Sequence, residues 1–198
     1  MSIKRLSSIF LFFALVLVGV YFIITIDEGS KNQAVEDSVA TFSSKELGIE
    51  FVYQTGPLGY VLQEVIPTEN DSDFLRSIVL TRTEDAVDVG QVLGGEGPPT
   101  ITIVVFKNPE NQEPKMWADK HPESSNINLK RGDVTEESVG GVNAIRYMAD
   151  GLYVSENVVA AYGENVYVIS GMYLDEESQL RKDFSPLLES VRFIPEAL

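Results

Sequence analysis

The clearest strand pattern in the chain is residues 139–174, VGGVNAIRYMADGLYVSENVVAAYGENVYVISGMYL. Three runs rich in Val, Ile and Tyr, at 142–148, 153–162 and 166–174, are typical of strands. The glycine pair Gly140–Gly141 favours a tight hairpin turn before the first run, and Gly163–Asn165 joins the last two. Because connections this short permit only antiparallel pairing, the stretch predicts an antiparallel sheet.

Further strands are predicted on both sides of this stretch, at 49–53, 60–66, 74–82, 100–106 and 191–194. The turn at Gly56–Gly59 and the polar loop at Thr68–Asp73 separate the first three of them. In the run at 100–106, TITIVVF, apolar side chains would point to both faces of an extended strand. We therefore expect both of its faces to be covered.

Two segments have the pattern of helices. Residues 113–120 suit a short helix, which Pro122 should end, and residues 176–190 place Leu180, Phe184, Leu187 and Leu188 at helical spacing. Pro186 lies inside the second segment and should kink the helix or split it in two. Since these helices must bury their apolar sides on the sheet, the predicted class is an α+β layered domain.

The N-terminal segment predicts one transmembrane helix. Residues 9–26, IFLFFALVLVGVYFIITI, carry no charge and contain 14 Ile, Leu, Val or Phe residues. These residues favour insertion by roughly −4 to −8 kcal/mol, and the run spans about 27 Å. Lys4 and Arg5 precede it, and Asp27 and Glu28 follow it. The positive-inside rule therefore predicts a cytoplasmic N-terminus and an extracytoplasmic C-terminal domain in a single-pass cell-membrane protein.

This segment leads to a division of the chain into four parts. Residues 1–6 are the expected cytoplasmic N-terminus, 7–26 the transmembrane signal anchor, 27–45 a juxtamembrane linker with a short strand near 40–42, and 46–198 the folded domain. A cleaved signal peptide is the alternative, although its apolar core would be shorter and would end in small residues. A lipoprotein anchor is excluded because the chain has no Cys.

Composition excludes several classes of site. The absence of Cys excludes disulfides and thiolate chemistry, and a single His excludes any site that needs two imidazoles. The net charge is −15 without a basic cluster, which argues against nucleic acid as a partner. The motifs G-x-S-x-G and S-x-x-K are absent from the sequence.

The remaining chemical motifs each have a structural interpretation. His121 follows a predicted helix, where it would cap exposed carbonyl groups. The glycines at 90, 94, 95 and 97 precede Pro98–Pro99 and a strand, which favours a plain loop over a phosphate-binding loop. The acidic run Glu69–Asp73 offers oxygens to Ca²⁺ but is expected to be a solvated loop. Arg131–Asp133 matches a cell-adhesion tripeptide, but Gly-Asp is also an ordinary turn, and a turn is expected here.

Tyrosines on the late strands form the remaining candidate surface. If Tyr147, Tyr167 and Tyr173 share one face of the sheet, they could line a groove for a ligand or partner, and otherwise they are interior strand residues. Trp117 is expected to be a core anchor under the short helix. The sequence predicts no catalytic, cofactor-binding or metal site.

Several segments in this order resemble the PsbP-like domains of bacterial membrane-anchored proteins. They are residues 47–53, Trp117, residues 139–144, residues 165–169 and residues 184–193, so the resemblance covers about 47–195. It implies an antiparallel sheet sandwiched by helices. The namesake family is a non-enzymatic, extrinsic subunit of the photosynthetic oxygen-evolving complex.

These observations predict a membrane-anchored, extracytoplasmic, non-enzymatic binding or scaffold module without a cofactor. We expect it to contact the membrane through residues 7–26 and to bind a protein of the cell envelope. The alternatives are an ectodomain that binds Ca²⁺ or a small molecule, and a hydrolase whose catalytic residues come together only in the fold.

Overall fold

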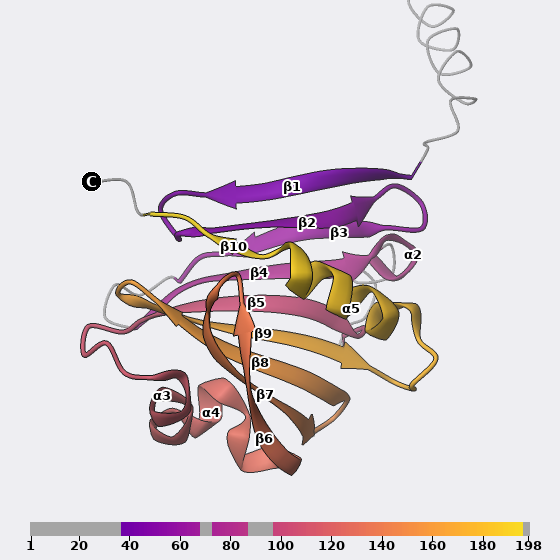
Figure 1. Ribbon diagram of the computed structural model, residues 1–198. Coiled ribbons are helices and arrows are strands. Elements are labelled where there is room, and N and C mark those ends of the chain that lie inside the picture. The colour runs from indigo at the N-terminus through magenta and orange to yellow at the C-terminus, as the bar shows by residue number, and fades with distance from the viewer. Residues whose placement is uncertain (1–36, 68–72, 87–96, 196–198) are drawn as a thin grey trace, which may run out of the picture. The chain divides into compact units, whose positions relative to one another are not determined.

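The structure is a computed structural model that describes residues 37–67, 73–86 and 97–195 (Figure 1). The predicted anchor at 7–26, the glycines at 90, 94 and 95, and residues 69–72 of the acidic run lie outside these residues. Within the described ranges, no helix is both long and apolar enough to cross a membrane.

Seven antiparallel strands form the large sheet, in the order β3-β4-β5-β9-β8-β7-β6. The predicted hairpin is confirmed, since Val139 pairs with Val142 across the two glycines, and β7, β8 and β9 follow one another as neighbours. The strands are β3 (Tyr60–Val65), β4 (Phe74–Arg82), β5 (Thr100–Lys107), β6 (Lys130–Val139), β7 (Val142–Asp150), β8 (Val154–Tyr162) and β9 (Asn165–Tyr173).

A second, three-stranded sheet combines the two ends of the described chain. Its order is β1-β2-β10, with β1 (Ser38–Ser44), β2 (Ile49–Thr55) and β10 (Arg192–Phe193). The short strand expected near 40–42 is confirmed and is longer, so the folded part includes residues that were assigned to the linker. Local patterns did not separate these strands from the large sheet, because the pairing of β2 with β10 joins residues about 140 positions apart and has no local signal.

The helices are α2 (Thr83–Ala86), α3 (Pro114–Lys120), α4 (Pro122–Ser125) and α5 (Gln179–Ser190), with a 3-10 turn η1 at Ile127–Leu129. One-turn helices have no periodicity to detect, so α2, α4 and η1 were missed. Pro122 begins α4 as well as following α3. Of the two outcomes expected at Pro186, a kink or a split, the split does not occur: α5 is one helix from Gln179 to Ser190, with Pro186 inside it and exposed.

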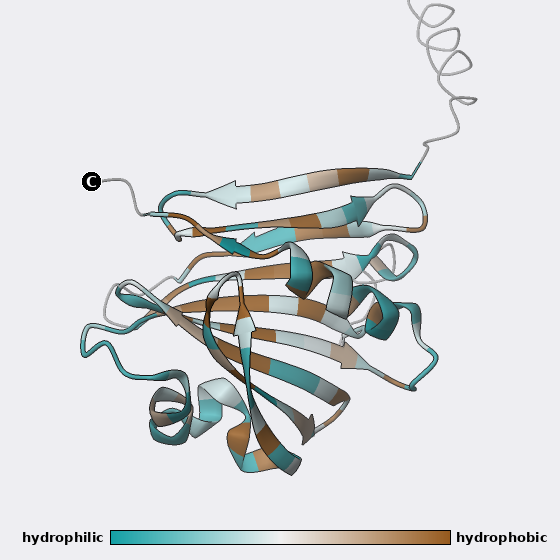
Figure 2. Ribbon diagram, in the orientation of Figure 1, coloured by the Kyte–Doolittle hydropathy of each residue, from teal (hydrophilic) through white to brown (hydrophobic). Residues whose placement is uncertain are grey.

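Both faces of the large sheet are covered, which confirms the α+β class, although one face is covered by β2 of the small sheet as well as by a helix. One face, here called the α5 face, buries Tyr167 and Ile169 of β9 with residues of α5 and β2. The opposite face, called the α3 face, buries Val166 and Val168 of the same strand with Trp117 of α3. Figure 2 shows the resulting apolar bands along the central strands.

The contact between α5 and β9 depends on Gly171. A Cβ atom at this position would lie 2.7 Å from Cδ2 and 2.8 Å from Cγ of the Phe184 ring, inside any normal contact distance. The ring is 1% exposed and has no room to move away. Glycine in β9 therefore sets how closely α5 can approach the sheet.

We expect Gly171→Ala to destabilise the fold by about 1–3 kcal/mol, because the added methyl group overpacks this contact. Urea denaturation followed by Trp117 fluorescence measures the change. Gly97→Ala is the control, since an added Cβ there meets nothing within 4 Å, and should change stability by less than about 0.5 kcal/mol. Equal effects of the two substitutions would contradict this account of the packing.

Candidate functional site

The three candidate tyrosines do not share a face of the sheet. Tyr147 lies on the α3 face and its hydroxyl donates to the Ser125 carbonyl, whereas Tyr167 lies on the α5 face and donates to the Leu47 carbonyl at 2.7 Å. Tyr173 contacts α5 through Arg181, whose guanidinium carbon is 5.1 Å from the ring centre. Their exposed fractions are 2%, 0% and 3% respectively, so the structure places them as interior strand residues rather than along a groove.

His121 and Trp117 have the structural roles expected of them. His121 is the C-cap of α3, with Nδ1 at 2.9 Å from the Trp117 carbonyl oxygen and its ring stacked on the indole at 4.5 Å. Trp117 is 2% exposed and packs against Phe106 of β5, so it anchors α3 to the sheet.

The other motifs are placed by the backbone of the sheet. The segment Arg131–Asp133 is not a turn: it lies in β6, where the register with β7 shifts, and Gly132 has a φ of +77°. The Asp73 carbonyl accepts a hydrogen bond from the Lys107 N–H at 2.7 Å. In the described ranges, no three His, Asp or Glu side chains gather as metal ligands would.

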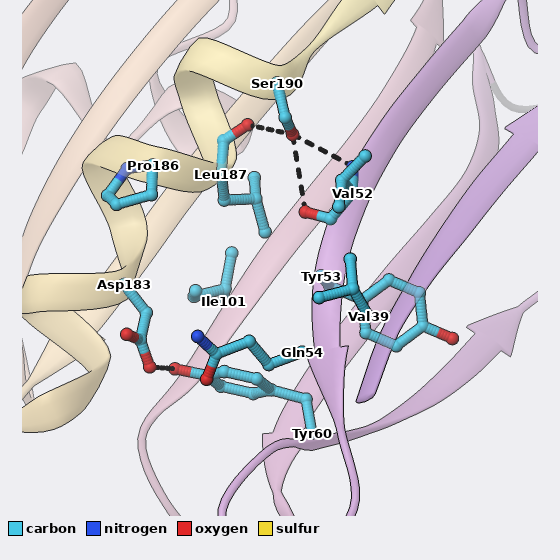
Figure 3. Close-up of a pocket in the computed structure, with 10 residues that line it drawn as sticks. All are labelled: Val39, Val52, Tyr53, Gln54, Tyr60, Ile101, Asp183, Pro186, Leu187 and Ser190. Carbon is cyan, nitrogen blue, oxygen red and sulfur yellow. Dashed lines mark hydrogen bonds between the residues drawn. The ribbon is translucent and has the colours of Figure 1, made fainter. Parts of the chain in front are cut away.

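A cavity of about 210 Å³ opens beside α5 and is the candidate site, here called the α5 groove (Figure 3). Its sides come from Val39 of β1, Val52 of β2 and Leu187 of α5, and Ile101 of β5 also lines it. Tyr60 and Asp183 lie together at one end, as Figure 3 shows. The cavity is therefore apolar along most of its length and polar at that end.

Hydrogen bonds hold one side of the groove in place. The Ser190 hydroxyl accepts from the Val52 N–H at 2.9 Å and lies 2.7 Å from the Leu187 carbonyl oxygen. Val52 lies two residues after Glu50, which is the residue of β2 that pairs with Arg192 of β10. Because Ser190 engages the edge of β2 where β10 no longer does, the C-terminal turn of α5 is fixed against that strand.

The polar end is organised around Asp183. The Tyr60 hydroxyl donates to Oδ2 at 2.9 Å, and the Gln179 amide donates to Oδ1 at 2.8 Å. Burial, and then the hydrogen bond to Asp183, raise the pKa of Tyr60 above its usual value. The phenol therefore stays protonated at neutral pH and remains a donor to this carboxylate.

The neighbouring cation, Arg82, is occupied by structural partners. Its guanidinium donates to the Leu58 carbonyl and to Glu84, with 3.1 Å between Nη2 and Oε1, and its Nη1 is 3.9 Å from Asp183 Oδ2. The guanidinium also lies 5.7 Å from the centre of the Tyr60 ring. Arg82 thus joins β4 to the polar end of the groove rather than serving as an open anion site.

Sequence reasoning missed this site, although one signal was present. Asp183 lies three residues after Leu180 and four before Leu187, so helical spacing places a carboxylate beside the apolar stripe of α5. The pairing with Tyr60, 123 residues away, has no sequence signal.

The chain matches no family model and no curated protein. Among solved structures it is similar to the solution structure of cyanobacterial PsbP (CyanoP) from Synechocystis sp. PCC 6803. The identity is 9%, the alignment covers 83% of this chain and 95% of that one, and the TM-score is 0.49. At this identity no functional residue is carried from that chain to this one.

Tyr147 predicts a pH dependence of stability. Burial raises its pKa to about 12, against about 10 in an unfolded chain, so the folded state holds the phenol proton more tightly. The stability that this difference in pKa contributes is fully present below pH about 10. It is lost as the pH rises from about 10 through about 12.

We expect Tyr147→Phe to flatten the loss of stability over this alkaline range relative to the unmodified chain, as measured by urea denaturation at each pH. The half-buried Tyr153, substituted by Phe, controls for general effects of removing a tyrosine. A slope for Tyr147→Phe as steep as that of the unmodified chain would count against the assignment.

Proposed function

We propose that the protein is a binding module held at the extracytoplasmic face of a membrane by residues 7–26, and that the α5 groove contacts a protein of the cell envelope. The observation that carries the proposal is the groove itself. Val39 and Val52 keep 69% and 37% of their surface exposed beside it, on strands that are hydrogen-bonded along their length. Exposed apolar side chains gathered at a cavity are typical of an interaction site.

The rigidity of the groove supports this function. Its sides belong to strands and to a helix that also build the main core, and Ser190 fixes α5 to β2. A preformed surface loses little conformational entropy when a partner binds. Burying its apolar lining would contribute about 25 cal/mol per Å² of surface removed from water.

The uncharged run at 9–26 and the basic residues before it support the membrane location. With a net charge of −15, the chain should be repelled from anionic lipid headgroups, which would keep the domain clear of the bilayer and open to partners.

We expect the full-length protein to stay with the membrane after an alkaline carbonate wash, and its C-terminal domain to be cut by protease added outside spheroplasts. An intact cytoplasmic reporter protein in the same sample shows that the spheroplasts are closed. Release by carbonate, or protection from the external protease, would contradict the proposed anchor and orientation.

We expect Val52→Asp to reduce cross-linked capture of an envelope partner in the native cell at least about tenfold, because it puts a charge in the apolar groove. Capture is measured by quantitative mass spectrometry of the purified, cross-linked protein. Leu174→Asp is the matched control, since Leu174 is 73% exposed and does not line the groove. Undiminished capture by Val52→Asp would remove the groove from the proposal.

A further inference from the structure

The polar end of the α5 groove presents a carboxylate with lone-pair positions left for further donors. Asp183 Oδ2 accepts from Tyr60 and Oδ1 accepts from Gln179, and each oxygen of a carboxylate has two lone-pair positions. The side chain is 15% exposed and lines the groove. Figure 3 shows it at the end where Tyr60 and Gln54 also meet the cavity.

The charges around this carboxylate favour a cation. Arg82 lies between two acids, with Nη2 at 3.1 Å from Glu84 and Nη1 at 3.9 Å from Asp183. The three side chains together carry one negative charge. A partly buried charge of this kind attracts a cation more strongly than an exposed one does, because water screens it less.

The rest of the groove suits an aliphatic chain. Val52, Ile101 and Leu187 supply apolar surface in a cavity of about 210 Å³, too small for a bulky ligand. A lysine side chain combines an aliphatic stem with a compact ammonium group and fits both features. Arginine fits less well, since its planar guanidinium group is bulkier than an ammonium group in a cavity of this size.

We propose that the envelope partner inserts a lysine side chain into the α5 groove, with its methylene groups against Val52 and Leu187 and its ammonium group donating to Asp183. This inference rests on the proposed function and names the chemistry of the partner. The net charge of −15 supports it further, because an acidic chain attracts a basic surface over long range.

The test uses n-butylamine, which is the lysine side chain without its backbone, and its neutral and anionic counterparts 1-butanol and butyrate. Each is titrated into the full-length protein in nanodiscs, with binding followed by NMR shifts of isotope-labelled Val and Leu methyl groups. We expect saturable shifts at Val52 and Leu187 with the amine, at least about tenfold tighter than with butanol, and none with butyrate.

Asp183→Asn should lower amine affinity to that of butanol, whereas Glu177→Gln changes the net charge equally at a 90% exposed side chain and should leave it unchanged. Tyr60→Phe keeps the carboxylate and should keep the preference for the amine. If Asp183→Asn does not fold, salt serves instead: raising it from about 50 to 500 mM should weaken binding of the amine and not of butanol.

Equal affinity for amine and butanol would overturn the lysine assignment and leave the groove as an apolar contact. Absence of saturable amine binding would also overturn it. Either result is distinct from failure of the proposed function, which is measured by partner capture with Val52→Asp.

Discussion

Alternate side chains of β9 are buried in two different cores, and the rest of the structure depends on this. Tyr167 and Ile169 pack beneath α5, while Val166 and Val168 pack toward α3. A strand covered on both faces cannot shift its register by one residue without exchanging the two sets of side chains. The position of β9 therefore fixes β5 and β8 beside it, and through them the ends of the large sheet.

The α5 groove is a consequence of how α5 meets this sheet. Gly171 lets the Phe184 ring approach β9, and Ser190 engages the backbone of β2. Asp183, next to Phe184, and Leu187, between Phe184 and Ser190, line the cavity from the same helix. One helix thus closes the core and supplies both the apolar side of the groove and its carboxylate, which is why a change in the packing of α5 would alter the site.

Local patterns predicted most strands within a few residues, because period-two alternation and paired glycines act over short distances. They missed β6, whose sequence KRGDVTEESV is polar and mostly exposed at the sheet edge and carries no apolar alternation. They also left open whether Tyr147 shares a face of the sheet with Tyr167 and Tyr173. Which face a tyrosine occupies depends on its register within its own strand, and the register of β7 relative to β9 is set through β8.

The sequence by itself determined the antiparallel strands, the α+β class, the amphipathic helix at the C-terminal end and the strongly acidic character of the chain, because each is a property of neighbouring residues. Only the tertiary structure decided that β2 joins β10 in a separate sheet, and that Tyr60 meets Asp183 across 123 positions. Contacts of that range arise from the packing of whole elements, and helix and strand periodicities carry no information about them.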